Sequence, residues 1–196
     1  MIHHSENSQK GQFPVNEDRL LVKRLSNDSI LAVMADGMGG LDHGEIAAEI
    51  AARQIVFSLE EKTILNKTDI YQALLSADEA IEQESLRRGM KMGCAIAIVY
   101  IQNCQMLFVS LGNIRISSCD EHGTTMESFA KDSSFTDPLG GSYLTDCIRG
   151  RGFREAPSVE EVKLPEAFHI RICTDGFYHP DSKDDSSVID IFRKPD

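Results

Sequence analysis

Apolar positions recur along the chain with two different periods, which predicts a mixture of strands and helices. Short apolar runs at residues 19–25 and 30–35 flank the polar turn 26–29 and are typical of a β-hairpin. Similar runs follow at 94–101, 105–111, 113–119, 168–173 and 188–192. The first three of these are separated only by Gln102-Asn103 and Gly112, so we expect an antiparallel meander.

Two longer segments place apolar residues at helical spacing. Residues 45–60 and 69–88 each carry them three or four positions apart, and Thr68 is a candidate N-cap for the second helix. Helices inserted between groups of strands indicate an α+β domain. We expect residues 1–196 to form one domain, with 1–10 as a polar, flexible tail.

Composition and charge limit the classes of molecule that we expect the protein to bind. Of the 196 residues 41% are hydrophobic and 26% are charged, as in soluble globular proteins, and the formal net charge is -11. Such a surface repels nucleic acids and anionic membranes, so we expect neither as a partner. The five cysteines include no Cys-x-x-Cys pair, and no long apolar run or signal peptide is visible, which favours the cytoplasm.

Three acidic residues lie at the ends of predicted strands. Asp36 and Asp175 each follow an apolar run and precede a glycine, and Asp184 lies just before the last run. Converging carboxylates repel one another unless a cation lies between them, and an oxygen-only ligand set favours Mg²⁺ or Mn²⁺. A single Asp-Gly pair is a common turn, so the prediction depends on the set.

Seven short segments follow one another in a characteristic order. They are Asn16-Glu17-Asp18, Asp36-Gly37-Met38-Gly39-Gly40, Met92-Gly93-Cys94-Ala95, residues 109–115, Leu144-Thr145, Cys173-Thr174-Asp175-Gly176-Phe177 and residues 184–188. Together they resemble the motifs of the metal-dependent protein phosphatase (PPM, protein phosphatase 2C-like) family, particularly its compact bacterial members. The resemblance covers nearly the whole chain.

The resemblance implies a fold of two stacked antiparallel β-sheets flanked by antiparallel helix pairs, an α-β-β-α sandwich. It also implies that Asp36 bridges two Mg²⁺ or Mn²⁺ ions and that the carbonyl of Gly37, with Asp175 and Asp184, completes their ligands. Glu17 and Asp18 would hold water molecules bound to the ions. Asp185 is the rival of Asp184, although the motif register favours Asp184.

The implied activity is signalling by hydrolysis of phosphoserine and phosphothreonine in proteins. A water shared by the two ions would attack phosphorus directly, without a phosphoenzyme. A Ser/Thr kinase is a further partner that the resemblance suggests. Met38 stands where some family members have a histidine, and it cannot act as a general acid.

Several positions depart from the family pattern. Phe13 occupies the place of a phosphate-binding arginine, for which Arg19 is a possible substitute. Asn113 and His179 replace two aspartates of a third, weaker metal site, which we expect to be weak or empty. His43 lies near the glycine loop, either contacting substrate or simply exposed to solvent.

These departures leave an alternative open. A catalytically weak or inactive relative could serve as a phosphoprotein-binding or kinase-partner module. Retention of Asp36, Asp175 and Asp184 favours the enzyme. An unrelated calcium-binding domain is poorly supported, because no Asp-x-Asp-x-Asp-Gly loop is present.

Overall fold

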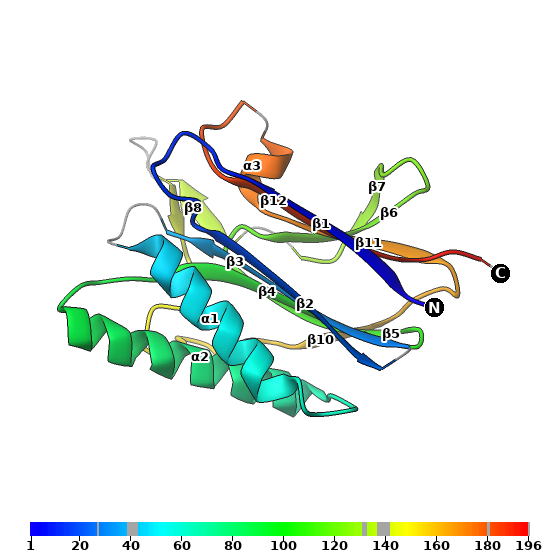
Figure 1. Ribbon diagram of the computed structural model, residues 1–196, viewed down its shortest axis with the longest axis horizontal. Coiled ribbons are helices and arrows are strands. Elements are labelled where there is room, and N and C mark those ends of the chain that lie inside the picture. The colour runs from blue at the N-terminus through cyan, green and yellow to red at the C-terminus, as the bar shows by residue number, and fades with distance from the viewer. Residues whose placement is uncertain (27, 39–42, 131–132, 137–141, 180, 196) are drawn as a thin grey trace.

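The structure is a computed structural model that describes residues 1–26, 28–38, 43–130, 133–136, 142–179 and 181–195. Its strands form two stacked antiparallel sheets, with a pair of helices packed on one of them (Figure 1). This arrangement confirms the expected α+β architecture of two sheets. Gly39 and Gly40 of the glycine loop lie outside the described residues.

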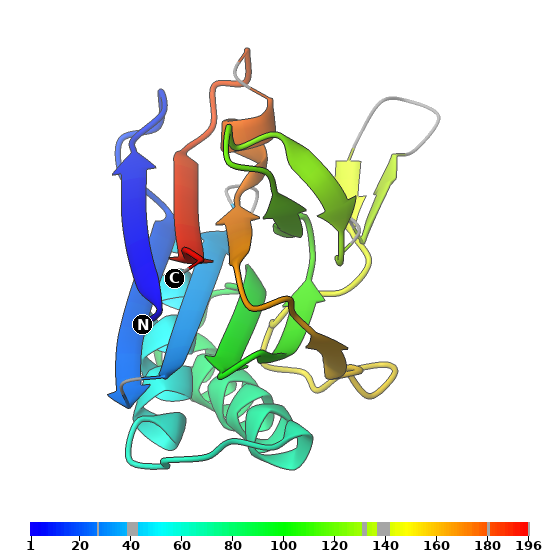
Figure 2. The same cartoon turned by 90° about the vertical axis from the view of Figure 1, so that its right-hand side faces the viewer.

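The first sheet, called sheet 1, contains the first and the last strand of the structure. In spatial order its strands are β1 (His3–Gln9), β12 (Ser186–Arg193), β11 (Phe168–Cys173), β6 (Arg115–Cys119) and β7 (Thr125–Ser128). Figure 2 shows β1 and β12 side by side, although almost the whole sequence separates them.

The second sheet, sheet 2, holds the predicted hairpin. In spatial order its strands are β10 (Glu160–Lys163), β5 (Gln105–Leu111), β4 (Cys94–Gln102), β3 (Ser29–Gly37) and β2 (Asp18–Ser26). A separate small pair consists of β8 (Ser134–Thr136) and β9 (Ser142–Leu144).

Strand β3 is buried on both faces, which explains its unbroken apolar sequence. Leu31 and Val33 pack with the core beneath the helices, whereas Ala32 and Met34 pack with the core between the two sheets. Alternation along a strand sends successive side chains to opposite faces. The double burial holds β3 firmly, and with it the carboxylate of Asp36 near its end.

Helices α1 (Gly44–Leu59) and α2 (Lys67–Arg88) cover the face of sheet 2 that points away from sheet 1 (Figures 1 and 2). Their bounds agree with the predicted segments within two residues at each end. The N-cap of α2 is Asn66 instead of Thr68, because Asn66 and Asp69 exchange side-chain-to-backbone hydrogen bonds of 3.1 and 3.0 Å. No helix within the described ranges combines the length and apolarity needed to cross a bilayer.

The expected helix pair on the other side of the sandwich is not found in the described parts of the chain. Strands β11 and β12 are joined only by the short helix α3 (Asp175–Tyr178) and a loop. The connection is too short for two packed helices, since helices of globular proteins average about three turns each. The outward face of sheet 1 therefore has no helical cover comparable with that of sheet 2 (Figure 1).

Two strands correct the sequence interpretation. Residues 1–10, expected to be a flexible tail, contain β1, which pairs with β12, while the neighbouring Ile2 is fully buried. The predicted meander is also wrong at its last strand, because β6 belongs to sheet 1 and β5 to sheet 2. The chain crosses between the sheets at Gly112, whose φ of +101° and close approach to Ala95 exclude a side chain.

Candidate metal and phosphate site

Acidic side chains from four separate segments meet at one end of the stacked sheets. Asp18 and Asp36 are direct cross-strand partners at the ends of β2 and β3. Asp175 follows β11 as the first residue of α3, and Asp184 lies two residues before β12. Glu17 precedes Asp18 and is the fifth member of what we call the acidic cluster.

Burial and mutual repulsion raise the pKa values in the acidic cluster. The pKa of Asp36 lies well above its ordinary value because its carboxyl is desolvated and because Asp18, Asp175, Asp184 and Glu17 add negative charge nearby. Desolvation is also the largest cause of the raised pKa of Asp184, followed by the charge of Asp175. Asp175 and Asp184 thus both act on the pKa of Asp36, as expected of side chains that lie near one another.

The pKa values of the two N-terminal members of the cluster, Glu17 and Asp18, are also raised. Desolvation raises the pKa of Glu17 to about 7, and repulsion from Glu45 and Asp185 contributes next. Desolvation raises the pKa of Asp18 to about 6, although hydrogen bonds from Ser187 and Thr174 oppose the shift. Burial and mutual repulsion therefore favour the protonated form of these carboxyl groups unless a bound cation compensates their charge.

The protein itself provides no such cation within the described ranges. No lysine, arginine or histidine there forms an ion pair with Asp36, Asp175 or Asp184. In the same residues, no three Asp, Glu, His or Cys side chains converge closely enough to surround one ion by themselves. A bound ion would therefore need backbone carbonyls or water among its ligands, as Mg²⁺ commonly has.

Unpaired oxygen atoms fit such an ion. Asn113 donates a hydrogen bond of 2.8 Å from its amide nitrogen to Oδ2 of Asp175. The remaining oxygens of this pair, Oδ1 of Asp175 and Oδ1 of Asn113, are buried and have no hydrogen-bond partner in the described structure. Buried acceptors without partners are rare, so they are good candidates for cation ligands. The side chain of His179, the other predicted member of a third site, is exposed.

Thr174 supports the acidic cluster from below, a role that its place in the sequence motif did not reveal. Its fully buried hydroxyl donates to Oδ2 of Asp18 at 3.1 Å and accepts a hydrogen bond of 3.0 Å from the backbone of Ser187. The hydroxyl thus connects β2 to β12 through the residue that precedes Asp175. The sequence alone does not indicate this role, because it depends on the buried position of Thr174 next to Asp18.

Asp185 has a different environment from its neighbour Asp184. It is 2% exposed, and its two carboxylate oxygens accept backbone hydrogen bonds of 2.7 Å from Gly11 and Glu17. These bonds hold the segment before β2 and so place Glu17. Asp184 is exposed to solvent, and its one hydrogen bond within the described residues is accepted from the backbone of Asp185, at 3.0 Å. Of the two rivals, Asp184 therefore has the free carboxylate oxygen.

The backbone around Gly37 is packed against the start of α1. A Cβ atom on Gly37 would lie 2.4 Å from the carbonyl carbon of Gly44, and one on Gly44 would lie 3.0 Å from a Glu17 oxygen. His43 caps α1 with a left-handed φ of 62°, and its exposed ring contacts Glu45 at 3.2 Å. The described structure thus gives His43 a local hydrogen-bond partner.

Arg19 is turned away from the acidic cluster. Its guanidinium donates to Glu49 of α1 at 2.7 Å and to the backbone carbonyls of Asn16 and Asp18. These contacts fix the entry into β2. Phe13 is 46% exposed. Neither residue supplies a positive charge beside Asp36, so a substitute for the missing phosphate-binding arginine is not evident in the described residues.

Bacterial phosphatases of known structure share the fold at low sequence identity. The catalytic domain of the serine/threonine protein phosphatase PstP, solved with two manganese ions, is 16% identical, has a TM-score of 0.78 and is matched over 97% of both chains. The S. agalactiae serine/threonine phosphatase is 18% identical, with a TM-score of 0.81 and coverage of 99% of this chain and 100% of that chain. Stp1 from Staphylococcus aureus is 15% identical, with a TM-score of 0.84 and coverage of 100% and 96%.

A comparison with curated proteins finds no match. The family model for protein phosphatase 2C matches residues 6–194, which include every member of the acidic cluster. Since this match spans nearly the whole sequence, the chain belongs to the protein phosphatase 2C family.

Proposed function

We propose that this chain is a metal-dependent protein phosphatase that hydrolyses phosphoserine and phosphothreonine in protein substrates. The observation that carries the proposal is the acidic cluster, in which burial and then mutual repulsion raise the pKa of Asp36 and Asp184, without a nearby protein cation in the described residues. Membership of the protein phosphatase 2C family supports the reaction class. The manganese ions of the PstP structure support the choice of Mg²⁺ or Mn²⁺.

Each member of the cluster has a proposed role. Asp36 and the carbonyl of Gly37 would hold the ions from the end of β3, while Asp175 and Asp184 would hold them from the other sheet. Glu17 and Asp18 would hold water around the ions. When bound, two divalent ions supply an activated water for direct attack on phosphorus and offset the charge of the phosphoryl group.

The protein's own contribution is to hold these groups in place. The double burial of β3 fixes Asp36, the amide of Asn113 orients Asp175, and the hydroxyl of Thr174 orients Asp18. Met38 carries no proton to give, so the leaving alkoxide must take its proton from water in the site. A rigid arrangement of this kind lowers the cost of reorganisation during the reaction.

Three further features belong to the proposal. A third ion at Asn113 and His179 would be weak or absent, because the first is neutral and already donates to Asp175. The five cysteines are free thiols, which suits a reducing cytoplasm. A cognate Ser/Thr kinase would supply the phosphorylated substrate. The alternative of an inactive binding module is not favoured, because the family match includes every member of the acidic cluster.

The test measures turnover of p-nitrophenyl phosphate and of a phosphothreonine peptide with Mn²⁺. We expect turnover that EDTA abolishes. Asp36→Ala and Asp175→Ala should each reduce it by at least about a hundredfold, the loss typical when a main electrostatic contributor is removed. Circular dichroism checks that both variants stay folded. Glu79→Gln on the exposed side of α2 is the matched control and should keep full activity.

An unchanged rate in either aspartate variant would refute the metal assignment. Asp175→Asn adds a sharper version, because it keeps the shape of the side chain and removes its charge. Turnover by the wild type that persists in EDTA would refute the metal dependence itself.

A further inference from the structure

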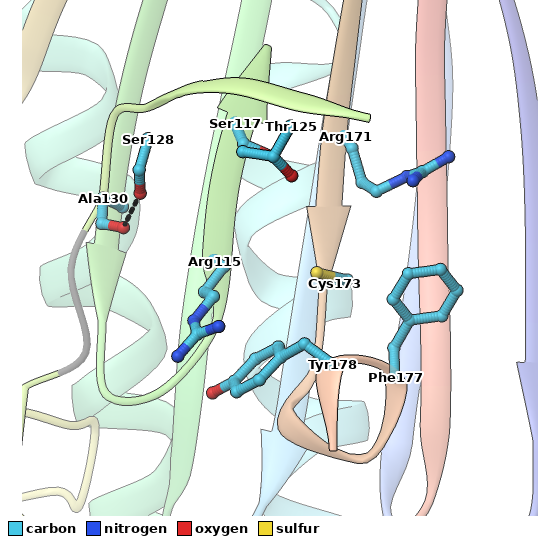
Figure 3. Close-up of a pocket in the computed structure, with 9 residues that line it drawn as sticks. All are labelled: Arg115, Ser117, Thr125, Ser128, Ala130, Arg171, Cys173, Phe177 and Tyr178. Atoms are coloured by element: carbon cyan, nitrogen blue, oxygen red, sulfur yellow. Dashed lines mark hydrogen bonds between the residues drawn. The ribbon is translucent and has the colours of Figure 1, made fainter. Parts of the chain in front are cut away.

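A pocket opens on the outward face of sheet 1, the face without helical cover. Figure 3 shows its lining residues, which come from β6, β7, the segment just after β7, β11 and α3. Cross-strand pairing explains why they share this face, since Arg115 is opposite Cys173 and Ser117 is opposite Arg171. The cavity has a volume of about 430 Å³, which is within the range of small-ligand sites.

The lining of this pocket suits an anion. Among the described residues it contains two arginines and four hydroxyl side chains but no carboxylate, although the whole protein has a net charge of -11. The lining residues are Arg115, Ser117, Thr125, Ser128, Ala130, Arg171, Cys173, Phe177 and Tyr178. Guanidinium and hydroxyl groups donate hydrogen bonds to carboxylate and phosphate oxygens.

The two arginines are held in fixed positions. Arg171 donates to both oxygens of Asp190, at 2.8 and 3.3 Å, and to the carbonyl of Gly123 at 2.9 Å. These bonds use only part of its fork, and Asp190 does not line the pocket. The guanidinium of Arg115 lies 3.5 Å from the ring centre of Tyr178. Fixed donors lose less conformational entropy when they bind an anion.

A short chain of contacts joins the pocket to the acidic cluster. The hydroxyl of Tyr178 donates to the backbone carbonyl of Asn113 at 2.7 Å, and the side chain of Asn113 donates to Asp175 at 2.8 Å. Arg115 is two residues beyond Asn113 in the sequence. A peptide with its phosphorylated residue at the cluster would therefore pass a neighbouring part of its chain close to the pocket.

We propose that this pocket binds an acidic side chain, a carboxylate or a second phosphate, that flanks the phosphorylated residue of the protein substrate. The proposal rests on the proposed phosphatase function and adds a substrate class to it, namely phosphoproteins with acidic flanking sequence. Phe177, which is 36% exposed at the rim, provides apolar surface for the rest of that side chain.

The test uses phosphothreonine peptides in which a glutamate, a phosphoserine or an alanine is placed in turn at each position on either side. We expect one position at which an acidic residue lowers KM by about tenfold, the size expected for a hydrogen bond to a charged group. Glutamate and phosphoserine at that position distinguish the two sources of negative charge. The rate with p-nitrophenyl phosphate, which has no flanking sequence, is measured beside them.

Variants at Thr125 test whether the acidic side chain binds in this pocket. Thr125→Glu brings a carboxylate into the pocket and should abolish the preference for acidic peptides, whereas Thr125→Lys should strengthen it. Met126→Glu is the matched control, because Met126 is the next residue in β7, is 71% exposed and does not line the pocket. All three variants should hydrolyse p-nitrophenyl phosphate at the wild-type rate.

Two results would overturn the proposal: equal KM values for acidic and alanine peptides at every position, or an acidic preference that survives in Thr125→Glu. Failure of the proposed function looks different, since the wild type would then not hydrolyse p-nitrophenyl phosphate with Mn²⁺. In that event, fluorescence anisotropy of labelled peptides measures binding with the same variants. Tighter binding of the acidic peptide that is lost in Thr125→Glu would still support the pocket, and its absence would refute it.

Discussion

At Asp184 and Asp185, two identical side chains are adjacent in the sequence and have opposite surroundings. Asp184 is open to solvent, and Asp185 is buried with a backbone N–H on each oxygen. The sequence motif indicated both residues as candidates, but it could not show which carboxylate already accepts hydrogen bonds from the backbone. That difference depends on the path of residues 11–17, which pass beside the loop before β12.

Matched substitutions at these two positions should have opposite effects. Asp184→Asn should weaken Mn²⁺ binding by at least about tenfold and leave the stability of the metal-free protein nearly unchanged. Asp185→Asn should lower the free energy of unfolding by about 1–3 kcal/mol, because the amide nitrogen cannot accept the hydrogen bond of Gly11 or Glu17. Isothermal titration calorimetry and urea unfolding measure the two quantities. A larger loss of Mn²⁺ affinity in Asp185→Asn than in Asp184→Asn would reverse the assignment.

The positions of the acidic residues in the fold were predicted best where they adjoin regular strands. Asp36 and Asp175 follow apolar runs whose ends can be read from the sequence, and both lie in the acidic cluster. Thr174 was overlooked as a site residue because its hydrogen bond to Asp18 joins positions 156 residues apart. The proposed role of Arg19 has no support from its contacts, since a guanidinium can turn toward any nearby carboxylate and here turns to Glu49.

Among the elements, helix α2 positions a loop as well as covering sheet 2. Asp78, 5% exposed on α2, accepts hydrogen bonds from three backbone N–H groups, those of Arg149 at 3.1 Å and of Gly150 and Gly152 at 2.7 Å. The loop returns to β4 through the bridge between Ile148 and Cys94. One buried carboxylate thus connects the helix to the strand that lies beside β3.

Replacing this carboxylate should loosen the loop. Asp78→Asn should cost about 1–3 kcal/mol of stability, because one oxygen is replaced by a donor that faces backbone N–H groups. Urea unfolding gives the loss, and hydrogen exchange should quicken at Arg149, Gly150 and Gly152. Glu79→Gln, exposed on the same helix, should change neither quantity. Slow exchange that persists at all three loop amides in Asp78→Asn would contradict the expected role.

Elements with buried side chains were predicted and elements without them were not. The apolar runs of β3 and β4 and the helical spacing of α1 and α2 reflect cores on one or both faces. All residues of β1 are exposed, so its sequence has no apolar alternation, and only pairing with β12 makes it a strand. The second helix pair was expected from resemblance alone, and the short link between β11 and β12 cannot hold it.

For the molecule as a whole, the acidic cluster links stability to pH. The folded protein raises the pKa of Asp18 to about 6 and that of Glu17 to about 7, whereas the unfolded chain keeps both near their ordinary values of about 4. Between those values the folded state binds more protons than the unfolded state. The free energy of unfolding therefore decreases as pH rises through this window, which is the reverse of an ion-paired carboxylate.

We expect the metal-free protein to lose stability between about pH 4 and pH 7, with Asp18 alone contributing a fall on the order of 3 kcal/mol. Urea unfolding in EDTA at a series of pH values measures this slope, and Glu17→Gln should flatten its upper part by removing one titrating group. Mn²⁺ should restore more stability at pH 7.5 than at pH 5. At pH 5 the ion must compete with protons bound to the carboxyl groups, whereas at pH 7.5 these protons have already dissociated. A slope identical in wild type and Glu17→Gln, together with an Mn²⁺ effect independent of pH, would mean that these carboxyl groups are not held together against their own repulsion.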